Sequence, residues 1–166
     1  PIFLIAGPQM GDPNFVRSVV LLLHHDETGA LGLVINHPTE MDLGSFAEAH
    51  DFSCHTRLTS SPVFRGGPIE PDRGWILHQD ASIQDEQQVL PGLYVSGAAE
   101  TLEQLLEKGS TFRLLLGYAG WGAAQLEAEM AQGAWLTVEA DGADVFGSAP
   151  ADLWALLMAK MGVDPS

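Results

Sequence analysis

Short apolar runs, broken by glycine and proline, mark the first third of the chain. Residues 2–6 are apolar, and residues 18–23 are mostly β-branched and aliphatic, so each run predicts a buried strand. The chain then reads Asp-Glu-Thr-Gly at 26–29, with glycine where a hairpin turn tolerates positive φ, before a third apolar run at 31–35. Strand, glycine turn and returning strand together predict an antiparallel hairpin.

The middle of the chain has a weaker pattern. Leu43, Phe46 and Ala47 share one face of a predicted short helix that begins near Asp42. A longer helix is predicted over residues 98–108, because three leucines fall at i, i+3 and i+4 and a glycine follows. Strands are also predicted at 74–78 and 93–96, a sharp reversal at Gly66-Gly67-Pro68, and polar surface segments at 53–62 and 80–88.

The final third alternates strands with helices. The pattern predicts a strand at 111–116, a glycine-rich turn at 117–122, a helix at 123–131, a strand at 135–138 and a closing helix at 152–161. Hairpins early in the chain and alternation late in it predict an α+β fold with a mainly antiparallel sheet flanked by helices. A doubly wound parallel fold would alternate throughout. The length fits a single domain over residues 1–166, since no linker or repeat divides the chain.

Charge narrows the choice of partners. The chain has 7 lysine and arginine residues against 22 aspartate and glutamate residues, a net charge of −15 at pH 7. Non-specific affinity for nucleic acid comes from basic side chains that neutralise phosphates, and here these side chains are few and scattered. Direct binding to nucleic acid is therefore disfavoured. The acidic surface is explained most simply by solubility.

The compartment is predicted from cysteine usage and hydropathy. Cys54 is the single cysteine, so no internal disulfide can form, which fits a reducing compartment. The longest aliphatic run, residues 19–23, is far shorter than the ~20 residues that a membrane helix needs. No charged and then apolar leader opens the sequence. We therefore expect a cytoplasmic protein that does not bind membranes.

The glycine-rich segment at 117–122 is the best candidate for a phosphate-binding loop, because helix N-termini bind anions. Its spacing, Gly-x-x-Gly-x-Gly, matches neither the Walker nor the dinucleotide pattern. Glu127 and Glu129 lie early in the following predicted helix, where they would favour the helix dipole and repel an anion. A tight turn with Tyr118 and Trp121 packed beside it is therefore favoured, and an anion site is the alternative.

The residues that could support catalysis or bind a metal form no recognised pattern. Adjacent histidines on a strand, such as His24 and His25, point to opposite faces and cannot easily chelate one ion. Neither Ser18 nor Ser96 lies in a Gly-x-Ser-x-Gly motif, and a sequence neighbour such as His55 does not by itself activate Cys54. The sequence therefore favours a protein with no metal, no cofactor and no catalytic activity.

Three arginines are conspicuous on so acidic a chain. Arg17, Arg65 and Arg73 each flank a predicted strand or a glycine turn. If they converge, they could bind a carboxylate or a phosphate. The favoured alternative is that they form buried ion pairs, with Asp12 or Glu127 as candidate partners.

Several sequence blocks, spread along the chain, together carry a resemblance to a known family. The most specific block is Leu-Gly-Tyr-Ala-Gly-Trp-Gly at 116–122, followed by Gln-Leu-Glu at 125–127. The others are Asp-Pro-x-Phe-x-Arg-Ser-Val-Val at 12–20, Gly-Leu-Val-Ile-Asn-x-Pro at 32–38, Gly-Gly-Pro at 66–68, Arg-Gly-x-x-Leu-His at 73–78 and Trp-Leu at 135–136. In these blocks the sequence resembles the AlgH/YqgE family, and the resemblance covers essentially its whole length, from residue 2 to about residue 163.

The resemblance implies a coiled, largely antiparallel sheet flanked by helices, bacterial origin and a cytoplasmic location. It implies no reaction. One member's name links it to control of alginate production, which implies a role in transcriptional regulation, although this chain has no helix-turn-helix signal. His24 stands where members often carry cysteine, so a redox role for that position is in doubt. Ala124 stands where glycine is common.

Two hypotheses from different classes follow. The first is a non-catalytic regulatory or binding protein that acts through an unidentified protein partner, and it is preferred. The second is an enzyme or small-ligand sensor with an anion-binding site, since polar and aromatic residues gathered at turns often carry function. Its candidate ligand-binding residues are Arg17, Ser18, Arg73, His78, Tyr118, Trp121, Gln125 and Glu127. A concave site that joins these residues would favour the second hypothesis, and their dispersal would favour the first.

Overall fold

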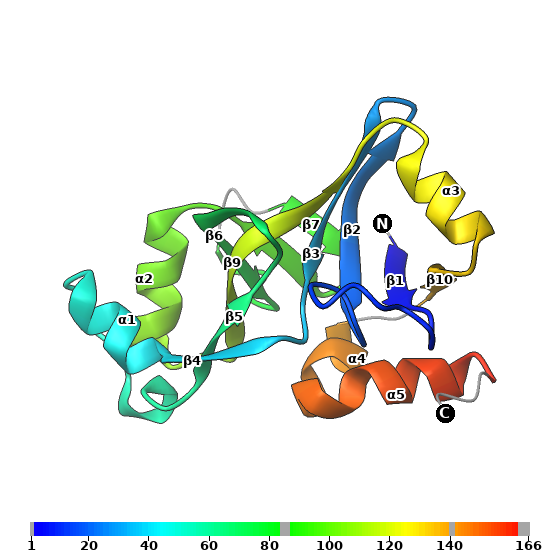
Figure 1. Cartoon of the computed structure of the whole chain (residues 1–166). Helices are drawn as coiled ribbons and strands as arrows, with labels where there is room; N and C mark the ends of the chain where they lie inside the picture. Colours follow the sequence, from blue (N-terminus) through cyan, green and yellow to red (C-terminus); the bar gives the residue numbers. More distant parts are fainter. Residues whose placement is uncertain (1, 84–86, 140–141, 163–166) are drawn as a thin grey trace.

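One curled sheet forms the frame of the molecule (Figure 1). The structure is a computed structural model that describes residues 2–83, 87–139 and 142–162. The strands are β1 (Ile2–Ala6), β2 (Val19–Asp26), β3 (Gly29–Val34), β4 (Pro38–Asp42), β5 (Pro62–Arg65), β6 (Ile69–His78), β7 (Gln87–Leu90), β8 (Leu93–Ser96), β9 (Phe112–Trp121) and β10 (Trp135–Val138).

The strand order confirms the α+β class. Along the sheet the order is β10-β1-β2-β3-β9-β6-β8-β7, and β4 joins through β5, which pairs with β9. All the pairings along this path are antiparallel, and they include the predicted β2–β3 hairpin. Strand β5, off this path, runs parallel to β9. The long strand β9 pairs with β3, β5 and β6, and so holds the two halves of the sheet together.

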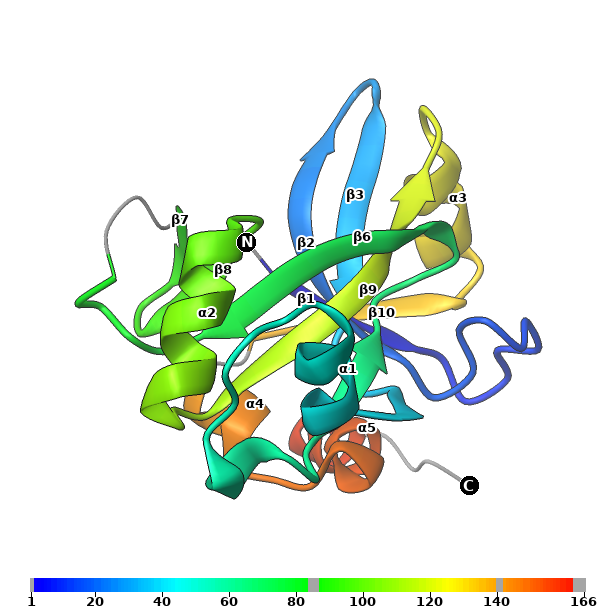
Figure 2. The ribbon, with the colours of Figure 1, turned by 90° about the vertical axis from the view of Figure 1, so that its left-hand side faces the viewer.

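Helices cover both faces of the curl. They are α1 (Leu43–Ala49), α2 (Ala99–Lys108), α3 (Gln125–Ala131), α4 (Gly142–Phe146) and α5 (Pro150–Lys160), with a short 3₁₀ turn at Thr56–Leu58. Figure 2 shows α1 and α2 in front of β6 and β9, while α4 and α5 lie at the lower end of the sheet. Within the described ranges, no helix combines the length and the apolar character that crossing a bilayer requires.

The predicted helix boundaries are largely confirmed by their capping residues. The Asp42 carboxylate accepts a hydrogen bond from the Ser45 amide at 2.8 Å and so begins α1. Gly109, with a φ of 72°, ends α2 in the left-handed conformation. Pro150 occupies the first turn of α5, where its missing amide hydrogen is not needed.

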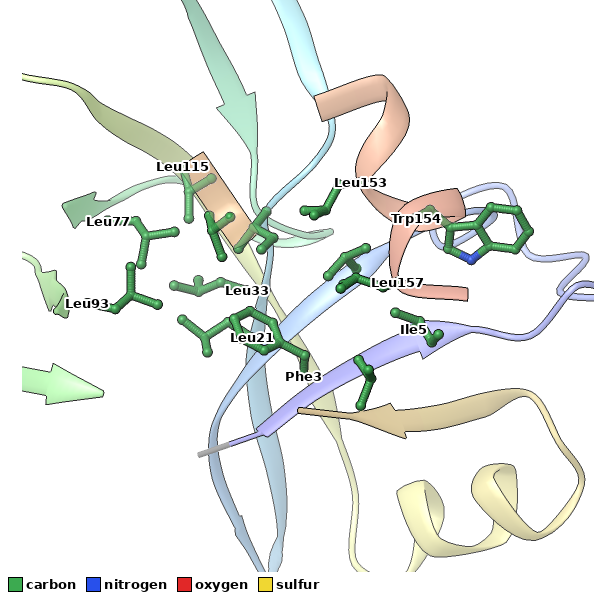
Figure 3. Packing of buried hydrophobic residues seen from close by; sticks show 14 of the residues in the cluster. Phe3, Ile5, Leu21, Leu33, Leu77, Leu93, Leu115, Leu153, Trp154 and Leu157 are labelled. Atoms are coloured by element: carbon green, nitrogen blue, oxygen red, sulfur yellow. The ribbon is translucent and has the colours of Figure 1, made fainter. Parts of the chain in front are cut away.

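The main core fills the inside of the curl (Figure 3). Leu153, Trp154 and Leu157 of α5 pack against Ile5 of β1, and the same cluster continues to Leu115 of β9. The outer face carries two further clusters. One lies under α1 and α2, and the other joins α3 and the loop after β1 to the β1–β2–β3 face. Burial on both faces explains why these strands read as continuous apolar runs in the sequence.

The predicted glycine-rich turn at 117–122 is wrong. Strand β9 does not end at residue 116 but runs on to Trp121. Leu114 packs on the outer face and Leu115 on the inner face, whereas beyond Gly117 it is Ala119 and Trp121 that face outward. Gly117 has a φ of 81°, so it inserts an irregularity that reverses the alternation without ending the strand.

Gly117 lies where another segment crosses the strand. The Gly66 amide donates to the Leu116 carbonyl at 2.7 Å, and the Gly66 carbonyl accepts from the Val34 amide at 2.8 Å. A Cβ on Gly66 would overlap the Gly117 carbonyl, and a Cβ on Gly67 would overlap the Tyr118 carbonyl. The predicted reversal at Gly66-Gly67-Pro68 is therefore a close contact between two backbones.

Four strands and helices escaped the sequence prediction. Strand β4 begins with a proline, β5 has only 4 residues, β7 lies in part of the segment predicted to be polar surface, and α4 has only 5 residues. Each is too short for hydrophobic periodicity to be read. Residues 84–86 of the predicted polar segment lie outside the described residues.

The backbone crossing predicts a strong effect of one methyl group. We expect Gly67→Ala to lower the free energy of unfolding by about 3 kcal/mol, because the Cβ meets backbone that cannot move aside and the φ of Gly67 is 156°. Urea unfolding followed by circular dichroism measures this. The control is Gly11→Ala, where a Cβ meets nothing within 4 Å. Equal stability of the two variants would contradict the crossing.

Candidate functional site

Arg17 and Ser18 lie where the loop after β1 enters β2, and they face different surroundings. The Arg17 guanidinium stands 5.1 Å from the ring centre of Trp154, and the backbone φ of Arg17 is 56°. Ser18 is fully buried, and its Oγ lies 3.3 Å from Nε2 of His37. Burial lowers the pKa of His37, and so does the nearby charge of Arg65. This Ser–His pair has the spacing of a nucleophile and base, but no substrate can reach a hydroxyl with no exposed surface.

Arg73 and Tyr118 come together on the inner face of β6 and β9. The Arg73 guanidinium lies 4.3 Å from the ring centre of Trp75 and 3.8 Å from a Glu70 carboxylate oxygen. Trp75 meets Tyr118 edge to face at 6.3 Å. A hydrogen bond to Glu70 is the main cause that raises the pKa of the Tyr118 hydroxyl. The group is an exposed ion pair stacked on two aromatic rings.

Trp121 and Gln125 both donate hydrogen bonds to Glu129, a residue that the sequence analysis did not include among the candidate ligand-binding residues. The indole N–H groups of Trp121 and Trp135 both donate to Oε1 of Glu129, at 3.1 and 3.0 Å. The Gln125 amide donates to Oε2 at 2.9 Å, and its oxygen accepts from the Gly122 amide. This network fastens α3 to β9 and β10. Gln125 and Glu129 are four residues apart on one helix, a spacing that could have suggested their contact.

Glu127 faces away from that network. Its carboxylate lies 3.0 Å from Nε2 of His25, near the tip of the β2–β3 hairpin, and this hydrogen bond lowers the pKa of Glu127. His24 is also at the hairpin and contacts Asp26 at 2.7 Å. Ala124, just before α3, has a φ of 63°, a conformation that glycine adopts without strain.

His78 lies at the end of β6, where its neighbours include Tyr94 and Asp80. It is fully buried, stacks on Tyr94 at 5.5 Å, and its Nδ1 accepts a hydrogen bond from the Asp80 amide at 3.0 Å. Among the described residues, no three His, Cys, Asp or Glu side chains come together to hold a metal ion.

The eight candidate residues are therefore placed by at least four local networks rather than by one. The three arginines do not converge on one site, because each has a different partner. Arg17 stacks on Trp154, Arg73 pairs with Glu70, and Arg65 donates to Oδ1 of Asn14 at 2.8 Å. Their predicted partners are engaged elsewhere, since Asp12 accepts from the Asn14 amide and Glu127 meets His25. The predicted ion pairs with Asp12 and Glu127 are wrong.

The whole chain can now be compared with known proteins. The AlgH-like family model matches residues 3–166. The chain belongs to the AlgH-like family. Two similar relatives are each named UPF0301 protein. The one from Myxococcus xanthus is 45% identical over 167 residues, which cover 100% of this chain and 92% of the relative. The one from Bordetella petrii is 43% identical over 166 residues, which cover 98% and 83%.

Solved structures agree with this family assignment. The solution structure of the AlgH protein from Pseudomonas aeruginosa is 38% identical and has a TM-score of 0.79, covering 98% of this chain and 88% of that one. A crystal structure from Corynebacterium diphtheriae, 22% identical, has a TM-score of 0.75 over 96% and 85% of the two chains, and supports the fold alone. The predicted resemblance is confirmed. Membership of the AlgH-like family brings no reaction, substrate or partner with it.

A concave site in this AlgH-like chain lies elsewhere, on the outer face between α1 and the sheet. This groove has a volume of about 420 Å³ and is lined by Met41, Ser45, Phe46, Ala49, His50, Asp72 and Leu116. None of these belongs to the eight candidate residues. Its residues come from three separate segments of the sequence, so no single motif could have revealed it. Most of its lining is apolar.

Cys54 lies near the same helix, and its surroundings raise the pKa of its thiol. Its side chain is partly buried, and desolvation is the main cause that raises its pKa, with the charge of Asp42 adding to the effect. Since the thiolate is the nucleophile, a raised pKa leaves little of the reactive form at neutral pH.

The Glu129 network predicts which acidic residue of α3 matters for stability. We expect Glu129→Ala to lower the free energy of unfolding by about 2–4 kcal/mol, because it leaves two indole N–H groups without an acceptor. Trp135 is only 2% exposed, so in the folded chain its indole N–H depends on this carboxylate as its acceptor. Urea unfolding gives the measurement. Glu127→Ala, on the same helix, is the control and should change little because its pair with His25 is exposed. Similar losses in both variants would argue against the network.

The Cys54 environment predicts slow alkylation. At neutral pH, iodoacetamide should modify Cys54 more slowly than it modifies free cysteine, and the rate should keep rising at a pH where free cysteine has already reached its plateau. Mass spectrometry over a time course measures both. The same chain unfolded in urea is the control and should react at the ordinary rate. A folded chain that reacts as fast as the unfolded one would contradict the raised pKa.

Proposed function

We propose that this protein is a non-catalytic regulatory protein that acts by binding another protein. One observation carries the proposal: the polar and aromatic residues that could have formed a reaction site are distributed over separate networks, in which they bond to neighbouring side chains and backbone. The Glu129 network and the buried Ser18 hydroxyl serve the fold. The feature that α1 and the sheet do expose to solvent is an apolar groove. Such a groove is typical of surfaces that bind other molecules.

Direct contact with DNA is not part of this proposal. A net charge of −15 opposes contact with the phosphate backbone, and the arginines are spread over different elements. A regulator of this charge would affect transcription through a protein that itself contacts DNA, or would act on another process. The charge instead favours a partner with a basic surface.

The alternative, a sensor with an anion site near Arg17, Arg73 and the segment at 117–122, has weaker support. Strand β9 continues through this segment to Trp121, so residues 117–121 do not form the loop that was predicted to bind a phosphate. Glu70 lies beside Arg73 and would compete with an anionic ligand for it.

A nuclease-treated native pull-down tests the proposal. The tagged chain should retain one protein at close to stoichiometric amount, and that protein should dissociate as salt is raised, because opposite charges steer and hold the complex. Mass spectrometry should read both proteins and small molecules. An unrelated acidic protein with the same tag is the control. A co-purifying metabolite without any protein partner would contradict the proposal and favour the sensor.

A further inference from the structure

The groove beside α1 exists because two elements leave the sheet uncovered there. Helix α1 has 7 residues and buries only Leu43 and Ala47. On the other side, β6 pairs with β9 at Ile69 and again at Gly74, while the β9 partners of these two residues, Tyr118 and Leu116, are only two positions apart. The extra residues of β6 bulge away from β9. Leu116 is therefore left with a glycine as its neighbour in the sheet.

Apolar side chains form the floor and one edge of the groove. Leu116 of β9 and Phe46 of α1 are each only half-buried, and Met41 on β4 is 47% exposed. Phe46 is held in place because His50 stacks on it at 4.2 Å. Met41 has a flexible thioether side chain that can adapt to a bound apolar group. Figure 2 shows α1 at this face, in front of β6 and β9.

The surroundings of the groove are acidic. Residues 38–51, which supply β4, α1 and the turn after it, contain four carboxylates and no lysine or arginine. The bulged part of β6 adds Asp72, while its one cation, Arg73, pairs with Glu70 on the inner face of the sheet. Asp72 lines the groove directly. An apolar floor inside an acidic rim is complementary to an apolar side chain flanked by basic residues.

We propose that this groove is the docking site for a basic segment of a partner protein, in which one or two bulky apolar side chains are flanked by lysine or arginine. The inference rests on the proposed function and names the chemistry of the partner. The apolar side chains fill the space over Leu116 and Phe46, and the flanking cations face Asp72 and the carboxylates of residues 38–51. The acidic surface as a whole steers such a segment toward the protein.

Binding of defined peptides tests the chemistry. The probe is a short peptide of Lys-Leu-Leu-Lys repeats, and the matched controls replace every lysine by glutamate or every leucine by serine. In amide NMR spectra of the labelled protein, we expect the first peptide to shift resonances of α1, Asp72 and Leu116, and more weakly at high salt. Neither control peptide should do so. Shifts spread equally over α2 and α5 would show only general attraction of charge and would overturn the proposal.

Two matched substitutions distinguish peptide binding at the groove from binding elsewhere on the surface. Ala49 is exposed, lies at the end of α1 and lines the groove, while Ala128 is exposed on α3. We expect Ala49→Lys to weaken binding of the peptide by about ten-fold or more, a factor that corresponds to about 1.4 kcal/mol. Ala128→Lys adds the same charge elsewhere and should change binding much less. Equal weakening by the two variants would overturn the proposal.

A photo-reactive residue at position 49 or 128 of the full chain then tests the natural partner in a lysate of cells that express the protein. The proposal is supported if position 49 cross-links a segment with bulky apolar residues flanked by lysine or arginine. If a specific partner is captured but cross-links at position 128 and not at 49, the groove is overturned and the proposed function stands. If no protein is captured specifically, the proposed function fails, and this inference fails with it.

Discussion

The close contact between Gly66-Gly67 and Gly117-Tyr118 is the constraint on which the rest of the fold depends. On one edge, β9 must pair first with β5 and then with β3, while its other edge pairs with β6. The exchange of partners happens at Gly117, where the Gly66 amide and carbonyl bridge Leu116 to Val34. Gly66, Gly67 and Gly117 allow this close approach because a Cβ on any of them would overlap backbone of the other segment. Gly117, the first glycine of the segment that suggested a phosphate loop, is therefore required by the sheet itself.

A buried cation strengthens the same junction from the inner face. The Arg113 guanidinium donates to the Ile35 carbonyl at 2.6 Å and to the Val145 carbonyl at 2.9 Å, and it lies between the rings of Phe64 and Phe146. Burial lowers its pKa to about 10, so it stays charged at neutral pH. Arg113 thus joins β9 to the end of β3 and to α4. A planar group with several donors fits this role better than lysine would.

The sequence predicted elements that have strong local signals and missed those fixed by distant contacts. The hairpin at Gly29, the cap at Asp42 and the C-terminal glycine at Gly109 each follow from neighbouring residues. The continuation of β9 beyond Gly117 does not, because it depends on a partner segment 50 residues earlier in the chain. For the same reason, Trp121 and Gln125 were predicted as ligand-binding residues, whereas their common acceptor in the structure, Glu129, was not among the candidates.

The same geometry that holds the sheet together also exposes the candidate interaction surface. Because β6 must bend away from β9 to follow the glycine crossing, it pairs at Ile69 and then only again at Gly74. The bulge moves Asp72 outward and leaves Leu116 without a covering side chain, beside a helix that buries only two residues. An edge or bulge of this kind is where a sheet protein can bind without giving up core packing. In this fold, therefore, the stable crossing and the open groove are two consequences of one arrangement of β6 and β9.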